Sequence, residues 1–174
     1  KFPEHVRDIG AQCQTVGLSR WVPLHAAAVW RFSPYAFRSA MSSGVVPYSD
    51  IRADDFPTEK ARAAIAELKR LRPYFLGDFY PLLTLSDAFD QWCAYQYHRP
   101  DTGAGFAVYL RRHKSPLTEM KSALRAIDKD KDYIVRLYYD FEQASEILMN
   151  GAELTETIIS IPDCPGSLLL EYLL

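Results

Sequence analysis

Residues Gly77-Asp78-Phe79-Tyr80-Pro81-Leu82 mark the point at which the sequence changes character. A helix-like segment precedes this stretch, and short segments with the alternation typical of strands follow it. The change predicts a junction between two domains: an incomplete one over residues 1–76 and a whole β domain over residues 77–174. The sequence therefore indicates more about the origin of the chain than about a complete active site.

The region after the junction reads as an all-β domain. Strands are predicted at residues 92–98, 106–112, 120–127, 133–141, 146–149, 158–161 and 168–173. Turn residues separate them, as in Arg99-Pro100-Asp101-Thr102-Gly103 and Asn150-Gly151. Short strands at this regular spacing predict an antiparallel β-sandwich.

The region before the junction has a different pattern. Two short apolar segments without alternation, at residues 17–28 and 40–46, are typical of parallel strands covered on both faces. Residues 58–72 show helical periodicity, with Asp54 or Asp55 as the expected cap and Pro73 at the end. These elements are too few to close a sheet of their own. The predicted fold class is therefore an α+β fragment.

Composition and charge limit the classes of function. With 48% hydrophobic and 24% charged residues, the chain can bury a core and does not resemble a disordered segment. A net charge of -2 and scattered basic residues argue against a nucleic-acid partner. No run approaches the roughly 18 apolar residues of a membrane span, so we expect a soluble protein of undetermined compartment. The start at Lys1-Phe2-Pro3 favours a fragment of a longer protein.

Cysteine and histidine spacings give no sign of a metal or cofactor site. Cys13, Cys93 and Cys164 are widely separated and have no ligand-like spacing, and the histidines are dispersed. We expect buried thiols, with one disulfide and a leftover thiol as the alternative. The expectation is therefore no metal and no cofactor.

Two groups of acidic residues permit a functional interpretation beside a structural one. Asp54 and Asp55 are adjacent carboxylates, and sugar hydrolysis uses two acids, but capping of the following helix explains them better. Asp78 could bind a sugar hydroxyl, although a hydrogen bond between the two domains is the favoured interpretation. Neither group by itself identifies a reaction.

Three other side chains are candidates for contact with a ligand. His25 is expected at the carboxyl end of the strand predicted over residues 17–28, where α/β barrels keep their active sites, and a structural role is the alternative. Trp21 and Arg38 belong to a region rich in aromatic and arginine side chains. Such a mixture suits the faces of sugars, but core packing explains it as well.

The sequence resembles the C-terminal third of the melibiase-type α-galactosidases of glycoside hydrolase family 36, in clan D. The resemblance is carried by residues 12–23, 34–41, 71–82, 92–100, 105–112, 124–128, 133–135 and 150–154, in the order of the family. It implies that the last two strands and the final helix of a (β/α)8 barrel are followed by the terminal β-sandwich. It also implies an intact enzyme that cleaves α-galactosides with retention, using two aspartates.

Neither aspartate of the family has a matching position in this sequence. Asp8 is the nearest carboxylate, but it lies too close to Gln12 to take the acid/base position. Retaining hydrolysis requires a nucleophilic carboxylate and a second carboxyl about 5 Å away. We therefore assign no catalytic residue, expect the chain alone to be inactive, and take His25, Arg38 and Trp21 as substrate-binding candidates on the barrel rim.

Two other functions remain open. A carbohydrate-binding module would need an exposed aromatic platform, for which the candidates are Tyr95, Tyr97, Tyr109, Tyr138 and Tyr139. A purely structural or oligomerisation module would bind no ligand. The expected partners are an α-galactoside or other glycan in the intact enzyme, with no nucleic acid and no membrane. Open strand edges in the first region leave self-association as a homo-oligomer open.

Overall fold

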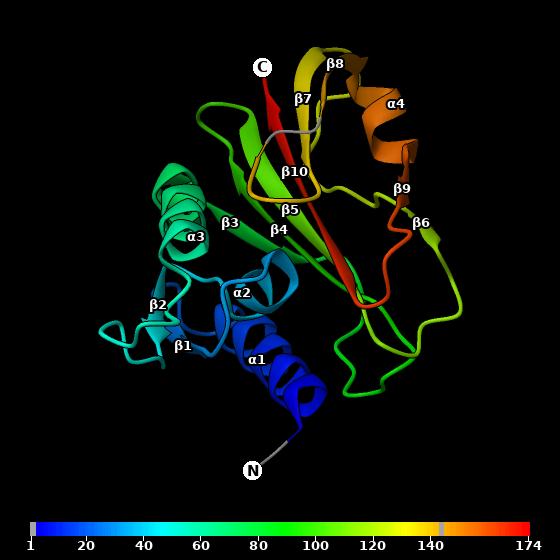
Figure 1. Ribbon diagram of the computed structural model, residues 1–174. Helices are drawn as coiled ribbons and strands as arrows, with labels where there is room; N and C mark the ends of the chain where they lie inside the picture. The colour runs from blue at the N-terminus through cyan, green and yellow to red at the C-terminus, as the bar shows by residue number, and fades with distance from the viewer. Residues whose placement is uncertain (1–2, 143–144) are drawn as a thin grey trace.

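The computed structural model describes residues 3–142 and 145–174, so the expectations that concern Lys1 and Phe2 lie outside the described residues. The helices are α1 (Glu4–Ser19), α2 (Pro34–Ala40), α3 (Thr58–Leu71), the 3-10 helix η1 (Arg72–Leu76) and α4 (Gly151–Glu156). The strands are β1 (Ala26–Val29), β2 (Gly44–Pro47), β3 (Asp78–Pro81), β4 (Cys93–Arg99), β5 (Ala104–Arg111), β6 (Glu119–Lys121), β7 (Asp132–Tyr138), β8 (Ser145–Asn150), β9 (Ile158–Ser160) and β10 (Gly166–Leu173). Figure 1 shows α1, α2 and α3 on one side of the main sheet and α4 on the other.

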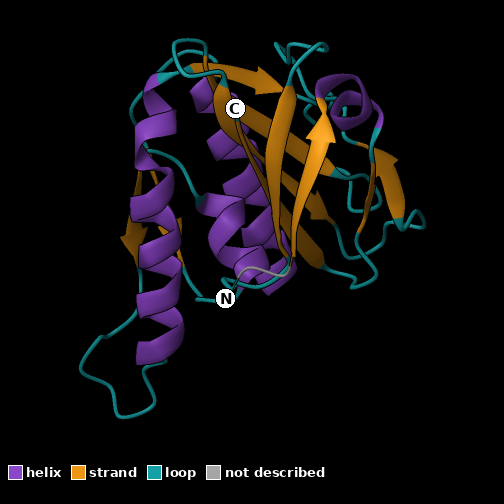
Figure 2. Ribbon diagram, turned by 90° about the horizontal axis from the view of Figure 1, so that it is seen from above, coloured by secondary structure: helices purple, strands orange, loops and turns teal. Residues whose placement is uncertain are grey.

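The centre of the fold is a six-stranded antiparallel sheet with the order β3-β4-β5-β10-β7-β8. The last strand, β10, lies between β5 and β7, so that Leu169 is opposite both Val108 and Tyr138. This arrangement confirms an α+β fold with an antiparallel sheet. The predicted sandwich would have a large second sheet on the other face. In its place lie a two-stranded sheet of β6 and β9 and the helix α4 (Figure 2).

Both faces of the main sheet are buried at its centre, whereas β8 at the edge is largely exposed. Successive side chains of a strand point to opposite faces. On β5, Phe106 and Val108 belong to the core shared with α2 and α3, whereas Ala107 and Tyr109 belong to the core shared with α4 and β9. All eight residues of β5 are therefore buried.

The N-terminal region contains a small parallel sheet. β1 pairs with β2 in parallel, with Ala27 opposite Val45. The strand predicted over residues 17–28 is wrong in extent, because α1 continues to Ser19 and β1 begins only at Ala26. The strand predicted over residues 40–46 is likewise shifted, since α2 ends at Ala40.

α1 was not predicted from the sequence, because polar residues occupy part of its buried face. Asp8, Gln12, Thr15 and Ser19 follow one another at helical spacing and are buried. Polar side chains at these positions remove the apolar periodicity by which a helix is recognised in a sequence. The helix therefore reads as an irregular segment.

α3 confirms the helix predicted over residues 58–72. Ala61, Ala64, Leu68 and Leu71 are buried along one face, as their spacing indicates. The predicted cap is wrong, because Pro57 occupies the N-cap position and no side chain caps the helix. The loop that carries Asp54 and Asp55 is exposed.

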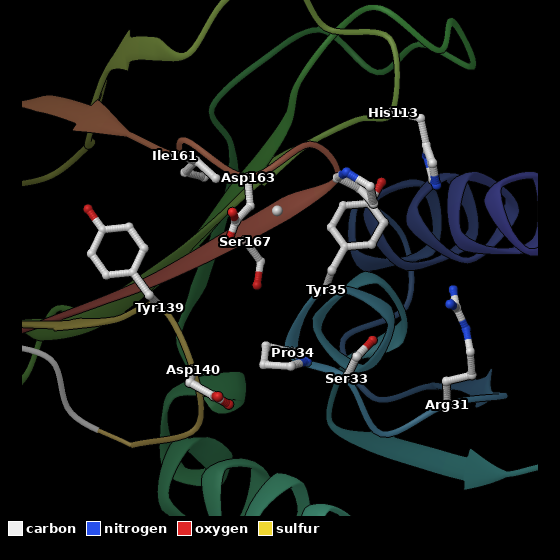
Figure 3. Close-up of a pocket in the computed structure, with 12 residues that line it drawn as sticks. Arg31, Ser33, Pro34, Tyr35, His113, Tyr139, Asp140, Ile161, Asp163 and Ser167 are labelled. Atoms are coloured by element: carbon white, nitrogen blue, oxygen red, sulfur yellow. The ribbon is translucent and has the colours of Figure 1, made fainter.

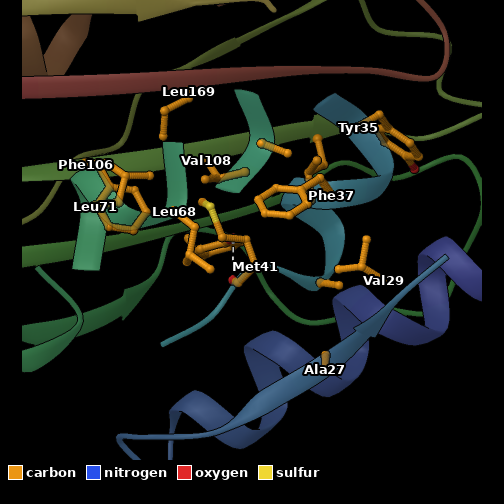
Figure 4. Packing of buried hydrophobic residues seen from close by; sticks show 14 of the residues in the cluster. Ala27, Val29, Tyr35, Phe37, Met41, Leu68, Leu71, Phe106, Val108 and Leu169 are labelled. Atoms are coloured by element: carbon orange, nitrogen blue, oxygen red, sulfur yellow. Dashed lines mark hydrogen bonds between the residues drawn. The ribbon is translucent and has the colours of Figure 1, made fainter. Parts of the chain in front are cut away.

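The helices and the sheet share one hydrophobic core. Leu71 and Phe75 pack in the same cluster as Phe37, Phe106 and Leu169, and Figure 4 shows several of these side chains converging below the sheet. The change from helices to strands occurs at Gly77, as expected. The division into domains of residues 1–76 and 77–174 stays a prediction. In the described part of the chain, no helix is both long and apolar enough to cross a bilayer.

Candidate functional site

An aromatic pair lies at the carboxyl edge of the parallel sheet. Trp30 follows β1 and Tyr48 follows β2, and the register places the last strand residues, Val29 and Pro47, opposite each other. The ring centroids of Trp30 and Tyr48 are 4.2 Å apart, and the amide of Tyr48 donates to the carbonyl of Val29 at 2.8 Å. In α/β folds, ligands bind at the carboxyl ends of parallel strands. This edge is therefore the first place to look for a site.

α1 adds charged groups to the same edge. Glu4, Arg7 and Asp8 lie on one face of the helix because residues three and four apart are neighbours. The guanidinium of Arg7 lies 4.5 Å from the ring centroid of Trp30. Arg31 donates to Glu4 at 2.7 Å and to Asp8 at 2.6 Å. Together with Tyr48 and Pro3, these residues line a cavity of about 660 Å³.

The ion pairs of Arg31 determine the role of the two acidic groups at this edge, Glu4 and Asp8. Burial raises the pKa of Asp8, while the adjacent Arg31 opposes that shift. Asp8 is 5% exposed, and its carboxylate is held by a charge-assisted hydrogen bond. Both acids thus orient Arg31 beside the aromatic pair. Aromatic faces next to fixed polar groups are suited to binding a ligand that has both apolar faces and hydroxyl groups.

Among solved structures, 13 chains match this protein. The galactosidase domain of the α-galactosidase-sucrose kinase AgaSK matches with a TM-score of 0.74 and 17% identity, over 95% of this chain and 24% of that one. A family 36 α-galactosidase, a variant of AgaA from Geobacillus stearothermophilus in complex with raffinose, matches with a TM-score of 0.59 and 20% identity, over 80% and 19%. This chain has the fold of a part of these α-galactosidases.

The match confirms the expected resemblance to part of a family 36 α-galactosidase, whereas the barrel remnant over residues 1–76 stays a prediction. The family 36 α-galactosidase AgaB from Geobacillus stearothermophilus gives a TM-score of 0.55 at 22% identity, again over 80% of this chain and 19% of that one. The chain thus spans between 19% and 24% of the length of these α-galactosidases. No protein-family model and no curated protein sequence matches the chain.

In this α-galactosidase-like fold, His25 lies at the opposite edge from Trp30. The expectation that His25 follows a strand is wrong, because β1 begins after it. Its Nε2 atom lies 2.9 Å from the hydroxyl of Ser19, which is 2.8 Å from the hydroxyl of Tyr97. Trp21 lies on the loop before β1 and is 85% exposed. Contact of Trp21 or His25 with a substrate stays a prediction.

Arg38 is an internal residue. Its side chain on α2 is fully buried and donates to both carboxylate oxygens of Glu67, at 2.9 and 2.7 Å. It also donates to the carbonyl oxygens of Tyr138 and Asp140 and to the hydroxyl of Ser167. The expected position on a rim is therefore wrong for Arg38, which instead connects the helices to the main sheet.

The tyrosine platform needed for a carbohydrate-binding module does not form as expected. Four of the five candidates are buried and only the last is exposed; the set is Tyr95, Tyr97, Tyr109, Tyr138 and Tyr139. The four point into one or other core because the sheet is covered on both faces. This overturns the aromatic platform on which that alternative depended.

The remaining candidates have structural explanations. Asp78 is exposed on β3 and accepts a hydrogen bond from the hydroxyl of Tyr80, so the expected link between domains is wrong.

Of the three free cysteines, Cys93 is buried, Cys13 is half-buried and Cys164 is exposed. Within residues 3–142 and 145–174, no group of three or more His, Cys, Asp or Glu side chains is placed to hold a metal ion.

Trp30 and Tyr48 were not selected from the sequence. Each directly follows a four-residue strand, so their position is meaningful only once the ends of those strands are known. The signal available was a tryptophan and a tyrosine placed just after two short apolar segments. Pairing those segments in parallel would have brought the two rings together.

Acidification should destabilise the fold. Burial lowers the pKa of His25, His98 and His113 below the ordinary value of about 6.5. The unfolded chain therefore binds more protons than the folded chain below that pH, and the free energy of unfolding falls as the pH falls through this range. Urea unfolding at about pH 7.5 and about pH 5.5 measures the effect. His98→Gln should reduce the difference, and equal or greater stability at the lower pH would contradict the expectation.

Proposed function

We propose that this chain is part of an α-galactosidase-like glycoside hydrolase that acts on α-galactosides as the intact enzyme. On this proposal β1 and β2 are the last two strands of a (β/α)8 barrel, α3 is its final helix, and residues 77–174 are the terminal β domain. The likeness to an α-galactosidase domain over 95% of the chain supports this assignment. The parallel pairing of β1 and β2, followed by α3, fits the end of such a barrel.

The aromatic pair at the carboxyl edge is the observation that carries the proposal. A barrel of this kind builds its active site from the loops that follow its strands. Trp30 and Tyr48 occupy such loops, and Arg31 is held beside them by two carboxylates. We propose that this edge contributes an aromatic wall and hydrogen-bond donors to a sugar site completed by other parts of the enzyme.

Catalysis is proposed to require groups that this chain does not supply. Retaining hydrolysis needs one carboxylate to attack the anomeric carbon and a second carboxyl to donate and then accept a proton. Asp8 and Glu4 are both engaged by Arg31, which suits a positioning role. We expect no release of nitrophenol from an aryl α-galactoside by this chain at high concentration. Saturable release lost in an Asp8→Asn variant would contradict this assignment.

Raffinose binding to the isolated chain tests the proposed site. Tryptophan fluorescence should change on addition of millimolar raffinose. Trp30→Ala, whose affinity is measured by calorimetry because the variant lacks the reporting indole, should bind about tenfold more weakly because a stacked ring is lost. Trp21→Ala is the matched control, since it removes an exposed tryptophan from the loop before β1. Sucrose, which lacks the α-galactosyl unit, should bind more weakly than raffinose.

The outcomes of this experiment distinguish the carboxyl-edge site from the residues selected from the sequence. Loss of binding in Trp30→Ala alone supports the carboxyl-edge site. Loss in Trp21→Ala alone would return the assignment to the residues chosen from the sequence. Equal binding of raffinose and sucrose would contradict recognition of an α-galactoside.

A further inference from the structure

A second pocket lies between α2, the loop after β7 and the turn before β10. Its volume is about 390 Å³, within the range of about 300–1,000 Å³ that small ligands occupy. Figure 3 shows side chains from all three segments around it. The polar and aromatic groups that matter here are Ser33, Tyr35, Tyr139, Asp140, Asp163 and Ser167.

Several of these groups retain hydrogen-bonding capacity. Asp140 uses one carboxylate oxygen to accept from the amide of Phe141, at 2.7 Å, and its other oxygen is available. The side chain of Asp163 is exposed at the mouth of the pocket. The hydroxyl of Ser167 accepts from Arg38 at 3.1 Å and therefore keeps its own proton for another acceptor. The pocket thus offers both acceptors and a donor.

A buried nitrogen at the same pocket has no partner. His113 lines the pocket, and its Nδ1 atom is buried without a hydrogen bond to any described residue. Such a group costs free energy unless a ligand or water satisfies it. The ring of Tyr35 lies edge-on to that of His113, with centroids 5.8 Å apart. The orphaned nitrogen therefore leaves a hydrogen bond open to a water or to a polar ligand.

The walls of the pocket are already fixed in place. The hydroxyl of Tyr35 accepts from Gln12 at 3.0 Å, and that of Tyr139 donates to the carbonyl of Ser160 at 3.0 Å. Ser167 is held by the buried Arg38. A site built from side chains with existing partners loses little freedom when a ligand binds. The pocket is therefore preorganised.

We propose that this pocket binds a neutral saccharide such as raffinose through one or two of its sugar rings. Asp140 and Asp163 would accept hydrogen bonds from sugar hydroxyls, and the tyrosine rings would cover apolar faces of the sugar. An anion is disfavoured by the two carboxylates, and the nearby Arg31 is already neutralised by Glu4 and Asp8. A polyol fits the mixture of acceptors, donors and aromatic faces.

The test is a titration of the 174-residue chain with raffinose, followed by the backbone amide signals in NMR. The choice of raffinose as probe rests on the proposed function. We expect saturable shifts at Gly166, Ser167 and Asp140. Asp163→Asn, which keeps the shape but removes the charge, should weaken binding at these amides by about tenfold. Tyr139→Ala should also weaken it.

The matched control is Asp130→Asn, an exposed aspartate on another loop, which should leave the affinity unchanged. Thermal denaturation confirms that each variant is folded. No shift at these amides at tens of millimolar raffinose, or shifts unaffected by both Asp163→Asn and Tyr139→Ala, would overturn the proposal. Saturation by calcium ions at the same amides without any response to the sugar would overturn it as well.

The fluorescence of Trp30 on addition of raffinose distinguishes failure of the proposed pocket from failure of the proposed function. Shifts at Gly166 that Asp163→Asn removes support the pocket even when Trp30 fluorescence does not change, in which case only the carboxyl-edge site fails. A Trp30 response without shifts at Gly166 overturns the saccharide pocket alone.

Discussion

Replacing Glu67 with alanine should lower the free energy of unfolding by about 3–5 kcal/mol. Glu67 and Arg38 are both buried and form a two-pronged ion pair. Removal of the carboxylate leaves a buried guanidinium without its counter-charge, which costs far more than loss of an exposed pair. Because the free energy of unfolding of a whole protein is only about 5–15 kcal/mol, this loss should remove a large part of the stability of the chain.

Urea unfolding of Glu67→Ala and Glu59→Ala measures this effect. Glu59 is on the same helix, but its pair with Arg62 is exposed, so its loss should cost less than about 1 kcal/mol. A double variant, Arg38→Met with Glu67→Leu, should regain much of the lost stability, because it removes both buried charges together. A similar cost for the two single variants would show that the buried ion pair has no special role.

Phe106→Ala should also cost about 3–5 kcal/mol, because it creates a cavity where the helices meet the sheet. The ring is fully buried on β5 and lies 5.4 Å from the ring of Phe75 and 5.5 Å from that of Tyr97, between centroids. Since Phe75 belongs to η1, the loss affects the contact between the first region and the main sheet. Both regions should therefore be destabilised together.

Two spectroscopic probes check whether the regions respond as one. In a Trp92→Phe background, which removes the tryptophan of the second region, tryptophan fluorescence reports on Trp21 and Trp30 in the first region, and far-ultraviolet circular dichroism reports on the whole chain. In Phe106→Ala the two urea transitions should coincide and move to lower urea. Leu148→Ala on the exposed face of β8 is the control and should change little. Separate transitions in the wild-type chain would contradict a shared core.

Local patterns predicted the elements that follow simple periodicities. α3 was predictable because small and apolar residues recur along one face and charged residues cover the other. β4, β5, β7 and β10 were predictable from short apolar segments bounded by turn residues. α4 was missed, since its start at Asn150-Gly151 reads as a turn, although Asn150 and Glu153 form a capping box.

The sequence predicted the types of side chain in the candidate site but not the positions of the residues that form it. The sequence indicated aromatic and arginine side chains near short parallel strands. A displacement of a few residues in the strand boundary moved His25 from the expected carboxyl end to the amino end of β1. The same displacement placed Trp30 and Tyr48 at the carboxyl edge. Strand ends depend on pairing between distant segments, which a local pattern does not contain.

By itself the sequence determined the class of the fold, the change from helices to strands at Gly77 and the resemblance to α-galactosidases. These properties depend on local periodicity and on the order of short motifs along the chain. Only the tertiary structure decided that β10 lies between β5 and β7 and that Arg38 is an internal ion-pair partner. It also brought Asp140, Asp163 and Tyr35 to one pocket, because packing joins residues that are far apart in the sequence.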